Sequence, residues 1–271
     1  MLVEVDVVML TRNSAKPFLE KSLDSVYQNV PVRKLFVVDA FSSDETLDIV
    51  RSYPNVVVVQ NGGNRAVARQ IGIEKAETEW HLHVDSDVIL SENWFYEVGK
   101  FMGEDVGAIW GLDMPINPHV YNRVKVMKYV RRMSLEDLMI RNASIRGGMH
   151  DTLLRTCLVR QMKIPEDLHI FEDWFIKKWI EDRGYKWVST KSPCCFHYNT
   201  PRFNSQFGYE LAKLQKKYRT QSFLITLRNF LLAAPKALAI LATSGDTIAF
   251  SDQLKYYYFN FVGRLKVEFE L

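Results

Sequence analysis

Cysteine is scarce in this sequence of 271 residues, which has three, and two of them, Cys194 and Cys195, are adjacent. This spacing fits neither a disulfide framework nor a zinc site, so we expect reduced thiols and a cytoplasmic protein. The opening residues, MLVEVDVVML, carry acidic side chains where a secretory signal peptide has basic ones, and we predict no signal peptide. The net charge is only +3, which gives no indication of a nucleic-acid partner.

Long uninterrupted apolar runs are also lacking. The nearest is residues 230–242 (FLLAAPKALAILA), which Pro235 and Lys236 interrupt. A membrane-spanning helix needs about 20 predominantly apolar residues, so this run is too short and too interrupted to predict one. A position in a membrane interface is still compatible with it.

Strand-like and helix-like patterns alternate in the first part of the chain, which is typical of an α/β fold with a parallel sheet. The expected strands are VEVDVVML, RKLFVVDA, NVVVVQN and EWHLHVDSD, and the helices between them are SAKPFLEKSLDSVYQN, SSDETLDIVRSY and NRAVARQIGIEKA. Ser43 or Asp44 is expected to cap the second helix. Ligands of open α/β sheets bind at the carboxyl ends of the strands, so that edge is where we look for a site.

Two aspartates, Asp85 and Asp87, follow the apolar residues of the fourth expected strand. Burying an unpaired carboxylate is costly, which indicates a partner that neutralises the pair. A hard divalent cation such as Mg²⁺ or Mn²⁺ takes carboxylate oxygens and leaves positions for phosphate. The alternative is a surface turn or a helix cap, for which D-S-D is also suitable. The place at the sheet edge favours the cation.

Other polar side chains follow the neighbouring strands and are expected at the same edge. They are Thr11, Asn13, Asp39, Arg65 and Arg69. Each alone has a structural explanation, such as a cap or a turn. Together they indicate a nucleotide site, with a carboxylate for the base or ribose and arginines for phosphate.

The pattern changes after about residue 103. VGAIWGLDM predicts another strand, a basic helix and the paired glycines of IRGGMHDTLLR follow, and residues 165–189 predict a helix, a turn and a strand. Glu172 and Asp173 lie at the start of that helix, where acidic residues also complement the helix dipole. The chain after FHYN is expected to be helical.

Taken in order, the motifs VVMLTRNS, LFVVDAFSSDET, NRAVARQIGI, HVDSDV, RGGMHDTLLR, FEDWFIKKWIEDRGYKW and FH resemble those of the inverting family 2 glycosyltransferases. The resemblance covers roughly residues 4–200. It implies a GT-A fold, which is Rossmann-like with a mostly parallel central sheet flanked by helices. The implied parts are a nucleotide-sugar-binding half (residues 1–102), an acceptor-binding and catalytic half (103–200) and a helical C-terminal extension (201–271).

The implied activity is metal-dependent transfer of one sugar from a nucleotide-diphospho-sugar to a saccharide or polyprenyl-linked acceptor, with Mn²⁺ or Mg²⁺. Thr11, Asn13 and Asp39 would contact the nucleoside. Arg65 and Arg69 would lie beside the nucleotide. Asp85 would face the ribose.

The resemblance also assigns the remaining site residues. Asp87 would ligate the metal, and His197 lies where some members of the family place a further metal ligand. Asp173, with Glu172 before it, matches the aspartate that is usually the catalytic base. Ala40 replaces a second aspartate that the family usually has. The Q-x-x-R-W motif of processive synthases is absent, which favours transfer of a single sugar.

Three alternatives were weighed. HVDSDVI resembles the nucleophile loop of haloacid-dehalogenase-like phosphatases, but Ile89 departs from that pattern, and SGDTIAF lacks the last aspartate of G-D-x-x-x-D. Sugar-phosphate nucleotidyltransferases have a Gly-rich loop after the first strand, and it is missing here. A non-catalytic nucleotide-sugar-binding module is the third, and the retained E-D pair argues against it.

The C-terminal part combines basic amphipathic stretches with aromatic residues. They are NRVKVMKYVRRM, KLQKKYR and YYYFNFVGRLK. Such segments suit the surface of an anionic membrane, which predicts a protein that is cytoplasmic or peripheral on the cytoplasmic face. Helices that cover the sheet or form a dimer contact are the alternative.

Overall fold

The computed structural model describes residues 4–200 and 203–269. The chain divides into two compact units, each treated by itself. The first comprises the described residues of Met1–Met114 and Met139–Tyr198, and the second those of Pro115–Leu138 and Asn199–Leu271. The boundaries expected at residues 102 and 200 stay predictions. Parts of the expected C-terminal extension, 201–202 and 270–271, lie outside the described residues.

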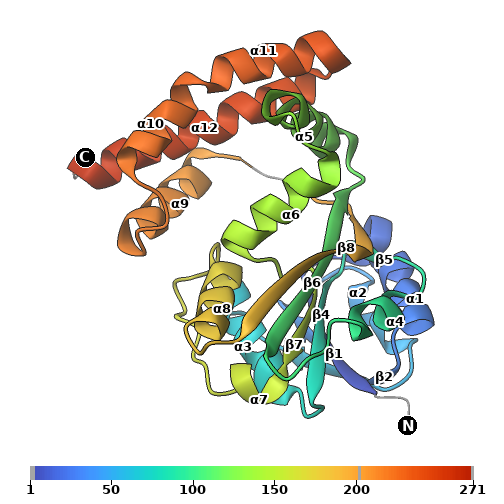
Figure 1. The fold of residues 1–271 in the computed structure, drawn as a ribbon. Coiled ribbons are helices and arrows are strands. Elements are labelled where there is room, and N and C mark those ends of the chain that lie inside the picture. Colours follow the sequence, from blue (N-terminus) through green and yellow to red (C-terminus); the bar gives the residue numbers. More distant parts are fainter. Residues whose placement is uncertain (1–3, 201–202, 270–271) are drawn as a thin grey trace. The chain divides into compact units, whose positions relative to one another are not determined.

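The first unit contains an eight-stranded sheet with the order β3-β2-β1-β4-β7-β6-β8-β5 (Figure 1). The strands are β1 (Val5–Thr11), β2 (Val32–Asp39), β3 (Val56–Gln60), β4 (Trp80–Asp85), β5 (Val88–Leu90), β6 (Val106–Pro115), β7 (Asp151–Arg155) and β8 (Lys186–His197). Strands β3, β2, β1 and β4 pair in parallel, while β4 with β7, β7 with β6, and β5 with β8 pair antiparallel. The predicted α/β fold and its parallel sheet are confirmed in the N-terminal half.

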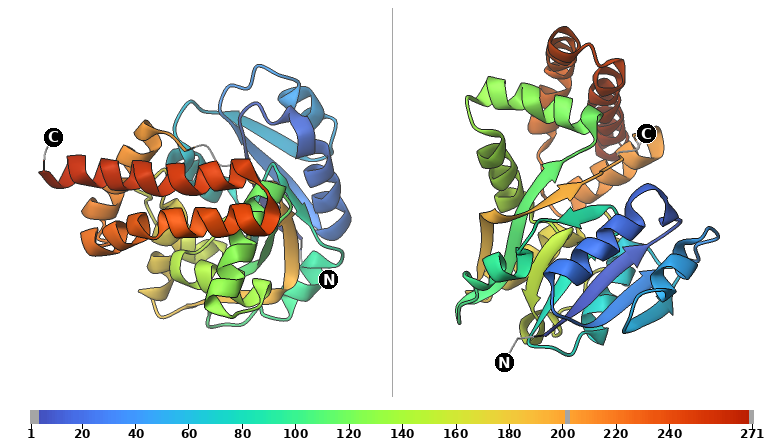
Figure 2. Two further views of the ribbon diagram at one scale, coloured as in Figure 1. Left: turned by 90° about the horizontal axis from the view of Figure 1, so that it is seen from above. Right: turned by 90° about the vertical axis from the view of Figure 1, so that its right-hand side faces the viewer.

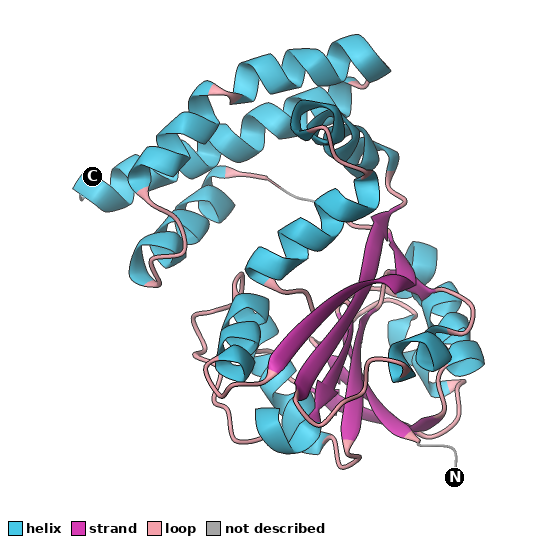
Figure 3. Cartoon of the chain, in the orientation of Figure 1, coloured by secondary structure: helices cyan, strands magenta, loops and turns pink. Residues whose placement is uncertain are grey.

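Helices cover the sheet of the first unit (Figure 3). They are α1 (Glu20–Asn29), α2 (Thr46–Arg51), α3 (Arg65–Lys75), α4 (Trp94–Gly99), α7 (Thr156–Val159) and α8 (Glu172–Glu181), with a short irregular helix η1 (Ala15–Leu19) before α1. Helix α6 (Leu135–Arg146) begins in the second unit and ends in the first. The apolar residues of β1, the second half of β2 and β4 are buried, as expected for parallel strands. Helix α3 lies so close to β1 that a Cβ at Gly72 would be 2.2 Å from Val8 Cγ1.

Of the two caps predicted for the second helix, Asp44 does supply a side-chain hydrogen bond at the helix start, although neither it nor Ser43 occupies the N-cap position. Helix α2 begins at Thr46, and Glu45 occupies the N-cap position without a side-chain hydrogen bond. The Asp44 carboxylate instead accepts hydrogen bonds from the backbone N–H groups of Ala15 (3.1 Å) and Thr46 (3.1 Å). The aspartate therefore ties the loop after β1 to the start of α2.

The second unit is helical, as the sequence predicts for the C-terminal part (Figure 2). It consists of α5 (Pro118–Arg131), α9 (Ser205–Lys217), α10 (Phe223–Leu231), α11 (Ala233–Ser244) and α12 (Thr247–Phe269). Asp246 caps α12 by accepting from the N–H groups of Ile248 (3.1 Å) and Ala249 (2.9 Å). It also contacts His119 Nδ1 of α5 at 2.9 Å, which helps to explain why residues 115–138 belong with the C-terminal helices.

Helices α9 and α12 cross at two glycines. A Cβ at Gly208 would lie 2.3 Å from the Phe259 carbonyl oxygen, and one at Gly263 would lie 2.5 Å from the Gly208 oxygen. Helix α11 lies beside α12. By length and composition alone, Phe223–Ser244 is the one helical stretch of the described chain that is long and apolar enough to cross a membrane, and 22% of an apolar 18-residue window within it is buried.

Candidate active site

The ends of β1 and β2 bring Thr11, Asn13 and Asp39 together. Thr11 Oγ1 donates to Asp39 Oδ1 at 2.8 Å, and Ser42 donates to the same carboxylate from its backbone N–H (2.9 Å) and its hydroxyl (2.5 Å). Asn13 Oδ1 accepts from the Ser43 N–H at 2.9 Å. Burial by itself would raise the pKa of Asp39, but the hydrogen bonds from Ser42 and Thr11 leave it lowered. A buried, ionised carboxylate therefore stands at this edge of the sheet.

Arg69 of α3 pairs with Asp85 at the end of β4. The Arg69 side chain is only 2% exposed, and its Nη2 donates to Asp85 Oδ1 at 2.5 Å. Although burial opposes ionisation of Asp85, the Arg69 charge holds its pKa below the usual value. Arg69 thus contacts the D-x-D carboxylate from the buried side.

Asp87 and His197 meet because β5 pairs with β8, with Val88 opposite His197. His197 Nε2 lies 3.5 Å from Asp87 Oδ1. One ligand atom each of Asp85, Asp87 and His197 lies within 4.8 Å of the other two. Carboxylate oxygens and an imidazole suit Mn²⁺, and the 3.5 Å between His197 Nε2 and Asp87 Oδ1 is short enough for both atoms to bind one ion with bonds of about 2.1 Å. The residues therefore fit a divalent cation.

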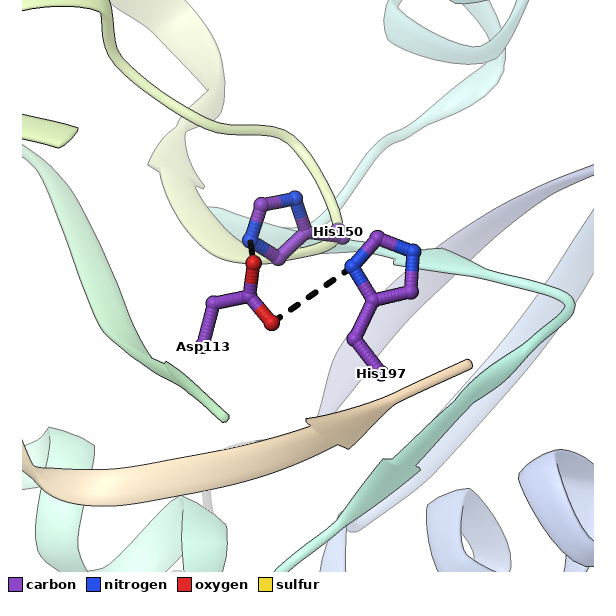
Figure 4. A group of neighbouring side chains, drawn as sticks. All are labelled: Asp113, His150 and His197. Carbon is purple, nitrogen blue, oxygen red and sulfur yellow. Dashed lines mark ion pairs between the residues drawn. The ribbon is translucent and has the colours of Figure 1, made fainter. Parts of the chain in front are cut away.

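The structure adds two residues that the sequence analysis missed, Asp113 at the end of β6 and His150 just before β7. Asp113 Oδ2 lies 3.3 Å from His150 Nε2, and Asp113 Oδ1 lies 3.5 Å from His197 Nδ1 (Figure 4). Burial favours a neutral His197 ring, but Asp113 and Asp87 hold its pKa well above the usual range. The available signal was an aspartate after the apolar run VGAIWGL, the same pattern that drew attention to Asp85.

Glu172 and Asp173 lie at the N-terminus of α8, each close to an arginine. Glu172 is 3% exposed and lies 3.6 Å from Arg65 Nε. Burial raises the pKa of Glu172 to about 7, although Arg65 opposes this. Asp173 Oδ2 accepts from Arg146 Nε at 3.1 Å. A partly neutral carboxyl group thus stands beside a carboxylate that is paired with Arg146.

The two arginines connect the E-D pair with the rest of the edge. Asp85 and Asp173, in addition to Glu172, contribute to the raised pKa of Arg65, so this guanidinium is within electrostatic reach of all three carboxylates. Gly147, which follows Arg146, has φ of +90° and packs on the α8 start, since a Cβ there would be 2.9 Å from the Asp173 carbonyl oxygen. This contact accounts for the first of the paired glycines.

Polar side chains, arginines and a group of possible cation ligands thus lie at one edge of the sheet. This arrangement is typical of α/β proteins that bind a nucleotide. The family model described as glycosyl transferase family 2 matches residues 6–164, and the chain belongs to this family. Together with the solved structures below, this confirms the predicted GT-A fold.

Three relatives give the range of similarity. The chain is 25% identical over 214 residues (74% of this chain, 36% of the relative) to the poly(ribitol-phosphate) β-N-acetylglucosaminyltransferase TarS of Staphylococcus aureus. It is 29% identical over 115 residues (38% of this chain, 35% of the relative) to TarP of the same organism. The chain thus spans about a third of the length of these relatives. Among solved structures, the mannosyltransferase PcManGT of Pyrobaculum calidifontis with GDP-Man and Mn²⁺ superposes with a TM-score of 0.63 at 18% identity, covering 98% of this chain and 88% of the other.

Proposed function

We propose that the chain transfers one sugar from a nucleotide-diphospho-sugar to an acceptor, with inversion at the anomeric carbon and with Mn²⁺ or Mg²⁺ bound by Asp87 and His197. The observation that supports this most is the convergence of Asp85, Asp87 and His197 within 4.8 Å at the carboxyl edge of the sheet. The PcManGT structure holds GDP-Man and Mn²⁺, and a TarS structure holds UDP. A bound divalent cation would neutralise the charge that develops on the leaving diphosphate.

The remaining steps, donor binding and proton transfer, are assigned to residues of the chain itself. Thr11, Asn13 and Asp39 are placed to bind the nucleoside, and Asp85, oriented by Arg69, to bind the ribose. Asp173 accepts the proton of an acceptor hydroxyl while the oxygen attacks the anomeric carbon and the bond to the diphosphate breaks. Arg146 contacts Asp173 and must leave room for the acceptor at this carboxylate.

The phosphatase alternative fails on structural grounds as well as on the family assignment. Its nucleophile would be Asp85, which here pairs with a buried arginine, Arg69. The aspartate of SGDTIAF, Asp246, is the cap of α12 in the helical unit. The non-catalytic binding module differs from the proposed enzyme only in turnover, so an assay separates the two.

The donor is found by screening UDP-, GDP- and dTDP-sugars, each with Mn²⁺ and with a chelator. We expect one nucleotide class to raise the melting temperature in the presence of Mn²⁺ and to be hydrolysed slowly without an acceptor. No Mn²⁺-dependent shift with any of the three classes would contradict the proposal. A shift without hydrolysis or transfer would favour the binding module.

We further propose that the second unit binds an anionic membrane surface on the cytoplasmic face, which would suit a polyprenyl-linked acceptor. Leu224, Leu231 and Leu238 follow one another at seven-residue spacing along α10 and α11 and are 74%, 64% and 59% exposed. Between Glu210 and Asp246 the sequence has lysines and arginines but no acidic residue. Apolar side chains with cations and no competing carboxylates are complementary to anionic head groups.

A further inference from the structure

Asp113 is a buried carboxylate with an incomplete set of partners. Its side chain is 15% exposed, and Oδ1 has no hydrogen-bond partner in the described part of the chain. A buried acceptor that is left unpaired destabilises the fold, and a charged one does so more strongly. His197 Nδ1 lies 3.5 Å from this oxygen, so a small movement of the ring would satisfy it.

His150 is already engaged by another donor. The indole N–H of Trp110 donates to His150 Nε2 at 3.2 Å. An indole nitrogen can only donate, so it uses the lone pair of that imidazole nitrogen. The same nitrogen is the one that faces Asp113. Asp113, His150 and His197 therefore do not form a second cation site that uses both histidines while the Trp110 contact is kept.

His197 lies between two carboxylates, and its two ring nitrogens face different ones. Nε2 faces Asp87, and Nδ1 faces Asp113. A neutral imidazole carries one proton and one lone pair, and the hydrogen bond made by one nitrogen decides which nitrogen is free to bind a metal. For Nε2 to bind a cation beside Asp87, the proton must be on Nδ1.

We propose that Asp113 is a positioning residue that holds the proton of His197 on Nδ1 and directs the Nε2 lone pair toward the cation at Asp85 and Asp87. This inference rests on the proposed metal-dependent function. Burial strengthens the argument, because His197 is 9% exposed and water is poorly placed to accept from Nδ1 in place of Asp113. Outer carboxylates that orient a metal-bound histidine change metal affinity by roughly 10–100-fold.

The first test measures Mn²⁺ binding without nucleotide by electron paramagnetic resonance of the free ion. We expect Asp113→Ala to raise the Kd by about 10–100-fold. Asp113→Asn should have a smaller effect, because a carboxamide oxygen still accepts from Nδ1–H. Asp105→Asn, an exposed acid just before the other end of β6, is the matched control and should bind as the wild type does.

The second test locates the proton. In ¹⁵N-histidine-labelled protein loaded with diamagnetic Mg²⁺, His197 should carry its proton on Nδ1, and His197→Gln assigns the signal. Asp113→Asn keeps the side-chain shape and serves here if Asp113→Ala does not fold. In the wild type, a proton on Nε2 would overturn the inference, and so would unchanged Mn²⁺ affinity in Asp113→Ala.

The outcome also separates the inference from the proposed function. If the wild type binds Mn²⁺ and His197→Gln does not, while Asp113→Ala binds normally, only the role of Asp113 is wrong. If the wild type itself does not bind Mn²⁺, with or without nucleotide, the metal-dependent function is wrong and the role of Asp113 with it.

Discussion

Arg69 and Asp85 form an ion pair of 2.5 Å that joins helix α3 to the end of strand β4. The pair engages Oδ1 of Asp85. Among the described residues no arginine pairs in this way with Asp87, whose side chain is 39% exposed. The two aspartates of the D-x-D motif are thus in different environments. Asp85 is fixed and Asp87 is accessible, and Asp87 is the one expected to respond to a cation.

Replacing Asp87 with alanine should therefore remove Mn²⁺-dependent nucleotide binding and transfer. The melting temperature of the metal-free protein should change little, because a half-exposed strand-end carboxylate supports little packing. Calorimetric titration with the nucleotide found in the screen, with and without Mn²⁺, measures the loss. Glu92→Ala, an exposed acid a few residues on, should behave as the wild type does. Transfer that persists with a chelator would rule out metal dependence.

Asp173→Asn should lower kcat by ~10²-fold or more with a hydroxyl acceptor, the scale expected when a general base is lost. Nucleotide affinity should change little, because the substitution is nearly isosteric. The measurement is a comparison of kcat and of the nucleotide Kd. Asp182→Asn, just beyond the other end of α8, changes an exposed acid paired with Lys178 and should have no effect. Turnover equal to the wild type would show that Asp173 only begins the helix.

Glu172 should make stability depend on pH. Its folded-state pKa of about 7 exceeds the ordinary value of 4.5, so the fold favours the protonated group. This contribution is fully present below the unfolded pKa and is lost as pH rises from 4.5 through about 7. Melting temperatures from pH 5 to 8 should therefore fall more for the wild type than for Glu172→Gln. Glu181→Gln, at the last residue of the same helix, is the control, and its melting temperature should change with pH as that of the wild type does. If Glu172→Gln also showed the wild-type pH dependence, the pKa of Glu172 would not be raised.

Asp246→Ala should destabilise the helical unit by ~1–2 kcal/mol at neutral pH, since it removes the cap of α12. Burial by itself would raise the Asp246 pKa, but the Ala249 N–H, Asn122 and His119 lower it to about 2. The contribution of the charge is present above the ordinary value of 3.8 and is lost as pH falls toward 2. Denaturant unfolding measures both effects. Asp246→Asn keeps a capping oxygen, so its free energy of unfolding should fall less than that of Asp246→Ala. An equal fall in both variants would mean that the capping hydrogen bonds contribute little.

Combined substitution of Leu224, Leu231 and Leu238 by serine should release the protein from anionic liposomes in a flotation assay. Replacing Lys213, Lys216, Lys217 and Arg219 by glutamine should weaken binding at low salt, since each cation near such a surface contributes ~1 kcal/mol. The matched control is Tyr96→Ser, which removes an exposed aromatic from the first unit. If the wild-type protein did not bind anionic liposomes, the proposal would be refuted, and the leucines would be assigned to a contact between proteins.

The sequence predicts the parallel part of the sheet because its signals are local. Apolar strand-like runs alternate with helix-like stretches, and a parallel sheet brings the ends of its strands to one edge. Asp85, Asp87, Asp39 and Thr11 could therefore be placed without coordinates. The apolar run before Asp113 marks it as a strand-end aspartate, but its place beside His150 could not be predicted. That place depends on the antiparallel pairing of β7 with β4 and β6, which no local pattern specifies.

The helical unit shows the same limit. The pattern predicts helices after residue 199, but it does not indicate that residues 115–138 pack with them. That association includes the contacts of Asp246 with His119 and Asn122, which are far away in the sequence. Contacts between single residues that are far apart in the sequence produce no repeating pattern, so they could not be predicted from it.

The pairing of β5 with β8 sets an order of assembly during synthesis. Strand β5 emerges early, but β8, with which it pairs, is the last strand of the first unit in the described chain to leave the ribosome. Until then, Asp87 has no histidine opposite it. The ends of β1, β2 and β4 therefore precede β8 in synthesis, whereas Asp87 and His197 can meet only when β8 has paired with β5. In the proposed function, the cation would therefore bind only after β8 has paired with β5 and the sheet is complete.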